Sequence, residues 1–320
     1  MTLSERSVEL RDVLAARDAI GARLHRTPTF SSKTLGELTG GRVFLKAELF
    51  QKTGSFKPRG VLTNLAALTS EQRARGVIGI SAGNHAQALA WGAGADGLDA
   101  LVVMWQDASA AKIEAARAYG ATVDLEAPGP AEAFERLHEL MEETGRTLVH
   151  PFDHPLTIAG QGTVGLELLE DVPEAAVVLV PVGGGGLISG IALAAGGRRV
   201  IGVEPELSPA LHDALAAGKP VPVAPRSIAD GLGAPFAGEL AVGVCNERVE
   251  QVVLVTEDEI AEGMRFLYRR AKLACEPAAG APIGALLAGK IPVERGETVV
   301  AVVSGGNVAA ETAVAILGGR

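Results

Sequence analysis

The amino-acid sequence predicts an α/β protein whose parallel sheets are covered by helices on both faces. The first observation is that short apolar runs alternate with segments of helical spacing along most of the 320 residues. The second is that these runs are nearly continuous, which is typical of strands buried on both sides. The third is the 40 glycines spread along the chain, because tight strand-to-helix turns need them.

The first half of the chain opens on an expected amphipathic helix at 7–24, which Pro28 ends. Strands are then expected at 42–49, 77–81, 100–105, 122–125 and 147–150. Helices are expected between them at 61–68, 84–95, 110–119 and 131–143.

The second half repeats this alternation. Strands are expected at 177–181, 199–204, 251–255 and 298–304. Helices are expected at 158–169, 186–195, 209–217, 257–270, 277–287 and 308–317. Residues 218–250 are rich in proline and glycine, so we expect them to be irregular. Two α/β lobes that share one cleft fit this order, and ligands in such sheets bind beyond the carboxyl ends of the strands.

Composition excludes several classes of function. The net charge of -9 and the aromatic content of 4% disfavour nucleic-acid binding. No uncharged apolar run reaches the roughly 18 residues of a membrane span. The charged start MTLSERSVELRD and two cysteines without a CxxC motif favour a cytoplasmic protein with buried free thiols.

One lysine, Lys57, stands in an unusual setting within residues 46–60. Phe56 and Pro58 flank it, and Gly54 and Gly60 lie close by. A lysine that holds a covalent cofactor needs a packing neighbour, a rigid turn and close backbone approach. Taken alone, however, the segment favours an ordinary solvated lysine in a polar loop.

Three further loops follow expected strands. Gly183–Gly186 suits a backbone nest around a phosphate, and it matches neither a Walker A loop nor the GxGxxG fingerprint. Residues 81–85 could hold a carboxylate at a helix N-terminus, although an ordinary N-cap explains them better locally. Residues 304–307 fit an anion site, a serine that hydrogen-bonds a ring, or a plain turn. With Lys57, these loops suit a lysine-linked cofactor that has a phosphate and a ring, namely pyridoxal phosphate.

Other polar residues give weaker signals. His150 and His154 have the spacing of a helical zinc pair, but Pro151 and Pro155 make a helix there improbable. Glu276 lies just before an expected helix, as either a helix N-terminal charge or a site residue.

At this point the chain resembles the fold-type II pyridoxal-phosphate enzymes, in the branch of the threonine/serine dehydratases and serine racemases. The resemblance runs from about residue 20 to 310. The matching segments are LKAELFQKTGSFKPRG (45–60), SAGNHAQALA (81–90), HPFDHPLTIAGQGTVGLEL (150–168), VPVGGGGLISGIA (180–192), VIGVEP (200–205), IADGLG (228–233), VTEDEI (255–260), EPAAG (276–280) and VSGGN (303–307).

The resemblance implies a two-lobed fold like that of the tryptophan synthase β subunit. The large lobe would comprise residues 1–68 and 154–320, and the small lobe residues 69–153. It further implies a homodimer. The chain ends just after Leu317, so we expect no C-terminal regulatory domain.

The resemblance also implies the roles of site residues. Lys57 would form the Schiff base with the cofactor and act as the base at Cα, Phe56 would pack beside the ring, and Asn84 would bond its hydroxyl. Ser304 would face the pyridine nitrogen. The implied phosphate-binding residues are Gly183, Gly184, Gly185, Gly186 and Leu187. The implied carboxylate-binding residues are Ser81, Gly83, Asn84 and His85.

The implied reaction is β-elimination from L-threonine or L-serine, which yields a 2-oxo acid and ammonia. The racemase branch needs a serine where this chain has Ala82, so racemisation is disfavoured. Dehydration of another β-hydroxy amino acid, such as 3-hydroxyaspartate or a phenylserine, is the first alternative, and serine racemisation the next. A non-enzymatic binder of the cofactor or of amino acids is the alternative from another class.

A divalent-cation site of this branch is only half present. Glu204 stands after the expected strand, but Ala210 replaces the acidic residue six positions on. We therefore expect no tight metal binding, with Glu204 as the one remaining ligand.

Overall fold

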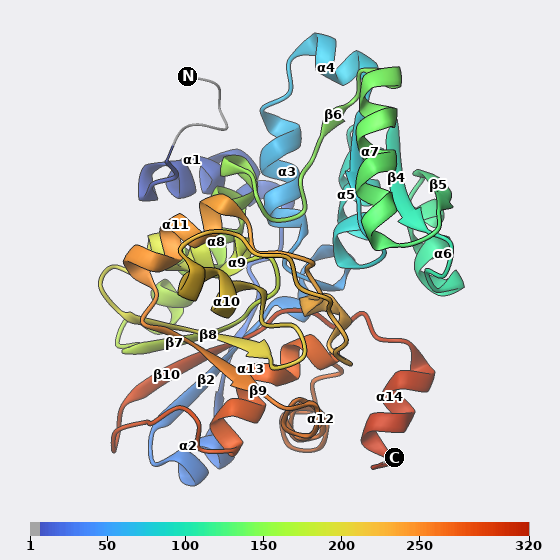
Figure 1. Ribbon diagram of the computed structural model, residues 1–320. Coiled ribbons are helices and arrows are strands. Elements are labelled where there is room, and N and C mark those ends of the chain that lie inside the picture. Colours follow the sequence, from blue (N-terminus) through green and yellow to red (C-terminus); the bar gives the residue numbers. More distant parts are fainter. Residues whose placement is uncertain (1–6, 320) are drawn as a thin grey trace.

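The computed structural model describes residues 7–319 (Figure 1). The first six residues and Arg320, which the expected large lobe includes, lie outside the described residues.

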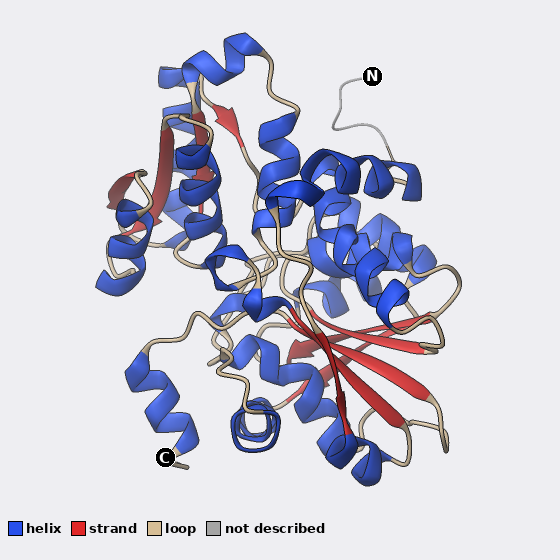
Figure 2. Cartoon of the chain, turned by 180° about the vertical axis from the view of Figure 1, so that it is seen from behind, coloured by secondary structure: helices blue, strands red, loops and turns tan. Residues whose placement is uncertain are grey.

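Two sheets organise the described chain (Figure 1, Figure 2). The larger has the order β1 (Thr29–Ser32), β2 (Arg42–Ala47), β10 (Thr298–Val303), β7 (Val177–Pro181), β8 (Arg199–Pro205) and β9 (Gln251–Val255). The smaller has the order β5 (Thr122–Ala127), β4 (Ala100–Trp105), β3 (Val77–Ile80) and β6 (Thr147–Leu148). All neighbours are parallel except β1 with β2, which confirms the predicted parallel α/β class.

Helices connect the strands. The α-helices are α1 (Leu10–Ile20), α2 (Lys33–Thr39), α3 (Pro58–Ala66), α4 (Ser70–Arg75), α5 (Asn84–Ala95), α6 (Ala110–Ala118), α7 (Pro130–Thr144), α8 (Pro155–Asp171), α9 (Gly186–Ala194), α10 (Ala210–Ala217), α11 (Glu239–Arg248), α12 (Glu257–Phe266), α13 (Pro277–Leu287) and α14 (Ala310–Leu317). Short turns of helix are η2 (Gly21–Arg23), η3 (Glu48–Phe50), η4 (Lys52–Gly54), η5 (Asp230–Leu232) and the π-turn η6 (Leu267–Ala271).

Strand β7 illustrates why the apolar runs are continuous. Val177 and Leu179 belong to a core shared with α12 and α13. Val178 and Val180 belong to a second core, shared with α8, α9, α10 and α11. Since successive side chains of a strand point to opposite faces, both faces of the sheet need apolar residues.

Helix α3 joins the two sheets. Its residues Val61, Leu62 and Leu65 pack in a core of the smaller sheet, together with α5. The other face of that sheet packs against α7. The expected lobe boundaries at 68 and 153 stay a prediction.

Several element predictions are wrong. Residues 239–248 form α11 within the segment expected to be irregular. This helix buries only a few apolar side chains, and its first N–H groups, those of Glu239 and Leu240, donate to the distant Asp153 at 3.0 and 3.1 Å. A partner 86 residues away leaves no local pattern in the sequence.

Other differences concern short elements and helix ends. The strand β1 and the helices α2 and α4 fall in segments for which the sequence predicts no element. The first helix begins at Leu10 rather than at residue 7, and the second expected helix begins at Pro58 rather than at 61. The expected helix 257–270 changes into a π-turn after Phe266. Within residues 7–319, no helix is both long and apolar enough to cross a membrane.

Candidate active site

Lys57 lies at the start of α3, where its backbone begins the helix and Pro58 occupies the first turn. The loop before it is tied to the loop after β10. Ser55 forms an isolated bridge with Gly305, and the Phe56 N–H donates to the Ser304 carbonyl oxygen at 3.2 Å. Two of the loops singled out in the sequence are therefore in direct contact.

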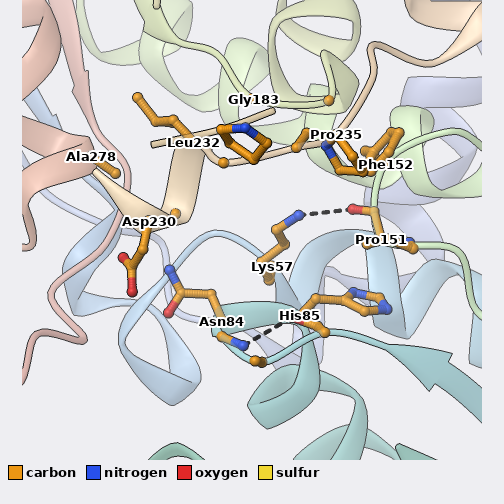
Figure 3. A pocket seen from close by; sticks show the side chains of 18 of the residues that line it. Lys57, Asn84, His85, Pro151, Phe152, Gly183, Asp230, Leu232, Pro235 and Ala278 are labelled. Carbon is orange, nitrogen blue, oxygen red and sulfur yellow. Dashed lines mark hydrogen bonds between the residues drawn. The ribbon is translucent and has the colours of Figure 1, made fainter. Parts of the chain in front are cut away.

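The Lys57 amine points into a cavity and donates to the carbonyl oxygen of Pro151 at 2.8 Å (Figure 3). The ring of Phe56 lies beside it, with its centroid 5.2 Å from Nζ. Burial lowers the pKa of the Lys57 amine to about 8, although the charge of Glu276 acts in the opposite direction. Near pH 8 a substantial fraction of this amine is therefore a neutral nucleophile and base.

The cavity has a volume of about 1110 Å³. It is lined by Lys57, the 81–85 loop, the glycine run, Ser304 and the 230–236 segment. The segments come from strand ends and helix starts around both sheets. The structure thus brings together all four loops that the sequence analysis singled out. The cavity lies beyond the carboxyl ends of the strands, as expected for this class of sheet.

The four glycines leave no room for side chains. A Cβ on Gly184 would overlap the ring of Phe152, and a Cβ on Gly186 would lie 2.7 Å from the Phe152 carbonyl oxygen. Gly185 has a φ of +89°, which side chains rarely tolerate. The glycine backbone at the start of α9 lines the cavity, and free N–H groups at a helix start are suited to hold a phosphate.

The 81–85 loop begins α5. The Gly83 N–H donates to Ser81 Oγ at 3.0 Å, which shapes the turn. His85 Nε2 lies 2.8 Å from the Val149 carbonyl oxygen, and burial together with the Lys57 charge lowers the pKa of His85 to about 3. This imidazole is therefore neutral at physiological pH, with its proton on Nε2.

Asn84 connects two other loops. Its Nδ2 donates to the two carboxylate oxygens of Glu276 at 2.9 and 3.0 Å, and its Oδ1 accepts from Asn307 Nδ2 at 2.8 Å. These contacts hold the amide at the cavity wall. The expected bond from Asn84 to a cofactor hydroxyl stays a prediction.

For Glu276, the sequence does not decide between a charge at a helix N-terminus and a residue of the site. It is 2% exposed and lines the cavity at the start of α13. Burial raises its pKa to about 7, against the opposing hydrogen bond from Asn84. The local signal was only an acidic residue before Pro277, which fits a helix N-terminus equally well.

Two buried polar side chains of the cavity are suited to a polar ligand such as the predicted cofactor. Gln161 is 1% exposed and lines the cavity, and its Oε1 has no hydrogen-bond partner in the protein. Ser304 is 2% exposed and lines the same cavity. A buried acceptor without a partner is costly, so a polar ligand in the cavity accounts for Gln161.

The sequence indicates the 228–236 segment as part of the pocket wall but not its contacts with other parts of the chain. Lys112 of α6 pairs with Asp230 of η5 across the cavity. The Phe236 ring contacts those of Phe134 and Phe152, with centroids 5.7 and 5.6 Å apart. Residues far apart in the chain meet in these contacts, so no sequence spacing could have indicated them.

Glu204, the one expected ligand of the half metal site, and the disfavoured pair His150 and His154 all have other partners. Glu204 accepts the N–H groups of Leu211 and His212, both at 2.8 Å, and so caps α10. His150 and His154 each accept backbone N–H groups of their own turns through Nδ1. In the part of the chain that the structure describes, no three His, Cys, Asp or Glu residues gather as metal ligands would.

The sequence matches a known family model over residues 22–305, described as "Pyridoxal-phosphate dependent enzyme". Among curated proteins, an L-threonine ammonia-lyase of Thermotoga maritima is 42% identical over 306 residues, which cover 94% of this chain and 76% of the relative. A catabolic L-threonine dehydratase of Staphylococcus aureus is 42% identical over 309 residues, covering 94% and 89%.

Solved structures of two enzymes have a similar fold. Maize serine racemase superposes with a TM-score of 0.92 at 36% identity, covering 96% of each chain. Threonine deaminase isoform 2 from Solanum lycopersicum superposes with a TM-score of 0.89 at 31% identity, covering 96% of this chain and 91% of that one.

Proposed function

The chain belongs to the family of pyridoxal-phosphate-dependent enzymes, and from this premise we propose that it is an ammonia-lyase acting on L-threonine and L-serine. The reaction removes the β-hydroxyl as water and the amine as ammonia, giving 2-oxobutanoate or pyruvate. Hydrolysis in the last step consumes one water molecule, so the overall reaction forms no net water. The names and structures of the relatives support threonine as the substrate.

The residues of the cavity suit pyridoxal phosphate. Bound there, this cofactor supplies an aldehyde that links to amines and a ring that withdraws electrons from the substrate Cα. The N–H groups of Gly183–Gly186 would hold its phosphate, and Ser304 would face its ring nitrogen. Phe56 would pack beside the ring, and Lys57 would provide the amine for the covalent link.

Lys57 has a second task in this proposal. Lys57 Nζ would accept the proton from the substrate Cα. A pKa near 8 suits a base at neutral pH, because the neutral form is populated and still binds a proton well. The carbonyl oxygen of Pro151 orients Nζ.

The 81–85 loop positions the substrate. The N–H groups at the start of α5 bind its carboxylate, which the positive end of the helix favours. His85, neutral and bonded to Val149, keeps the loop in place without adding a charge.

One observation carries the proposal: a lysine with a lowered pKa and a side-chain-free glycine nest line the same cavity. Serine racemisation is the second candidate, because a serine racemase is among the similar structures. Ala82 also lines the cavity and has no group that could carry a proton, which favours elimination.

The test is a substrate panel for the chain purified with pyridoxal phosphate. We expect 2-oxobutanoate from L-threonine, with little D-serine from L-serine. Lys57→Ala should lower kcat by roughly 10³-fold or more, because the covalent link and the base are both lost. D-serine as the main product would contradict the choice of elimination, and unchanged activity in Lys57→Ala would contradict the proposal itself.

The same proposal includes a homodimer and a cytoplasmic location. The apolar rings of Phe30 and Phe50 are exposed and pack against each other on the surface, which supports an assembly. Light scattering should give twice the chain mass of 32.8 kDa, and a monomer mass would contradict the dimer.

A further inference from the structure

A cluster of buried charges lies directly behind the lysine loop. We call it the buried ion cluster; its members are Lys46, Glu48, Arg59, Glu167 and Asp171. Lys46 and Glu48 are 0% exposed and Arg59 is 1% exposed. Charges this deep are stable only when each has partners, so the cluster needs its complete set of contacts.

Arg59 is the centre of the cluster. Its Nε and one terminal nitrogen donate to the two oxygens of Glu48, both at 2.8 Å. Its terminal nitrogens also donate to the two oxygens of Glu167 at 2.8 and 2.9 Å, and to Thr163 Oγ1 at 3.0 Å. All five N–H groups of the guanidinium are thus used, in two bidentate pairs and the bond to Thr163.

These pairs enclose the loop that carries Lys57. Glu48 lies in η3 before the loop, and Arg59 lies two residues after Lys57, so their contact joins the two ends of the loop. Inside the loop, Thr53 has a φ of 57°, a left-handed conformation that is strained for a side chain with a branched Cβ. A strained loop keeps one conformation only if its ends are held.

The second bidentate pair joins this loop to α8, through Glu167. Helices α3 and α8 are in close contact, because a Cβ on Gly160 would lie 2.5 Å from the Arg59 carbonyl oxygen. The segment that leads into α8 contains Pro151, whose carbonyl oxygen accepts from Lys57 Nζ. Arg59 thereby connects the element that carries the lysine with the element that orients its amine.

We infer that Arg59 is a positioning residue, which holds Lys57 Nζ at the cavity by fixing both ends of its loop against α8. This inference rests on the proposed function only in taking Lys57 as the reacting amine. Arg59 does not line the cavity itself, so its effect passes through Lys57.

The effect is one of position rather than of charge. The charged or titratable groups facing Lys57 are Glu276, His85 and His150, from α13, α5 and the turn before α8. None belongs to the buried ion cluster. A change at Arg59 therefore alters Lys57 only if the loop moves.

The experiment compares Arg59→Lys, which keeps the charge but loses the bidentate fork, with Glu48→Gln, which keeps the shape but loses the charge. Arg199→Lys is the matched control. Arg199 likewise forms a bidentate pair with Glu250 and also donates to Glu297. It is the first residue of β8, whereas the cavity lies beyond the carboxyl ends of the strands.

Two quantities are measured on the full-length protein. The first is the pH midpoint for acetylation of Lys57 before cofactor is added, read by mass spectrometry of its peptide. The second is kcat and KM for L-threonine with the cofactor bound. We expect Arg59→Lys and Glu48→Gln to raise the midpoint by about one pH unit, because a loosened loop lets water reach Nζ. We expect kcat to fall about tenfold with KM within about twofold.

The control should lower the melting temperature without changing either quantity. If the midpoint and kcat of both test variants match those of the control, Arg59 is only structural and the inference is wrong. If Arg59→Lys does not fold, Glu48→Gln decides alone. An inactive wild type would contradict the proposed function, but the acetylation midpoint would still decide on Arg59.

Discussion

At the scale of single residues, the environment of Lys57 determines its chemistry. Burial disfavours its charged form, while the carboxylate of Glu276 favours it, and burial is the stronger effect. Glu276 in turn is held by Asn84 and has a pKa of about 7, so it is mostly ionised where Lys57 titrates. The two groups are therefore coupled through the cavity.

Replacing Glu276 by Gln should move the titration of Lys57 to lower pH. The carboxylate stabilises the ammonium form, so its loss leaves burial unopposed and the neutral amine appears below pH 8. The measurement is the pH midpoint of Lys57 acetylation in the cofactor-free chain. Glu204→Gln, a change at another buried carboxylate, should leave the midpoint unchanged, and an upward shift in Glu276→Gln would contradict the coupling.

At the scale of elements, helix N-termini build the site. α3 begins after Lys57, α5 begins at Asn84, α9 begins at Gly186 and α13 begins after Glu276. Each places backbone N–H groups or a side chain at the cavity, and together they favour a ligand with a phosphate and a carboxylate. The start of α10 differs, because Glu204 occupies its N–H groups.

Glu204→Ala should lower the free energy of unfolding by about 2 kcal/mol, because the N–H groups of Leu211 and His212 lose their acceptor. Activity at saturating cofactor and substrate should stay within about twofold, since the capping contact lies outside the cavity. Chemical denaturation with and without Mg²⁺ measures the free energy of unfolding. A Mg²⁺-dependent stabilisation of the wild type that disappears in the variant would instead support the predicted half metal site.

At the scale of the whole molecule, two sheets meet around one cavity. Besides the backbone connections, two side-chain contacts span the cavity: the ion pair of Lys112 with Asp230 and the ring contact of Phe134 with Phe236. The ion pair is partly exposed, so solvent and salt weaken it. It is suited to bias the relative position of the two sheets rather than to hold the fold together.

Asp230→Asn should therefore raise KM for L-threonine about two- to fivefold, with kcat and the melting temperature nearly unchanged. The KM of the wild type should rise with salt and that of the variant should not, because the screened interaction is gone. Asp99→Asn, which removes the surface pair with Arg146 on the smaller sheet, is the control and should leave KM unchanged. A variant KM that keeps the full salt dependence would exclude a role for the pair.

Local patterns were sufficient to predict much of this molecule. Continuous apolar runs indicated parallel strands covered on both faces, and the structure has them. Loops rich in glycine after these strands indicated the candidate site around Lys57 and Gly183–Gly186, and all of them line one cavity. These signals are local because strand burial and close backbone approach act on consecutive residues.

Contacts between residues far apart in the chain were decided only by the tertiary structure. Glu276 meets Asn84 across 192 positions, Arg59 meets Glu167 across 108, and α11 begins on a carboxylate 86 residues away. Such pairs have no periodicity, because chain folding rather than spacing brings them together. The sequence by itself thus determined the class of fold and the chemistry at the strand ends. The tertiary structure decided which charges surround Lys57 and what holds its loop in place.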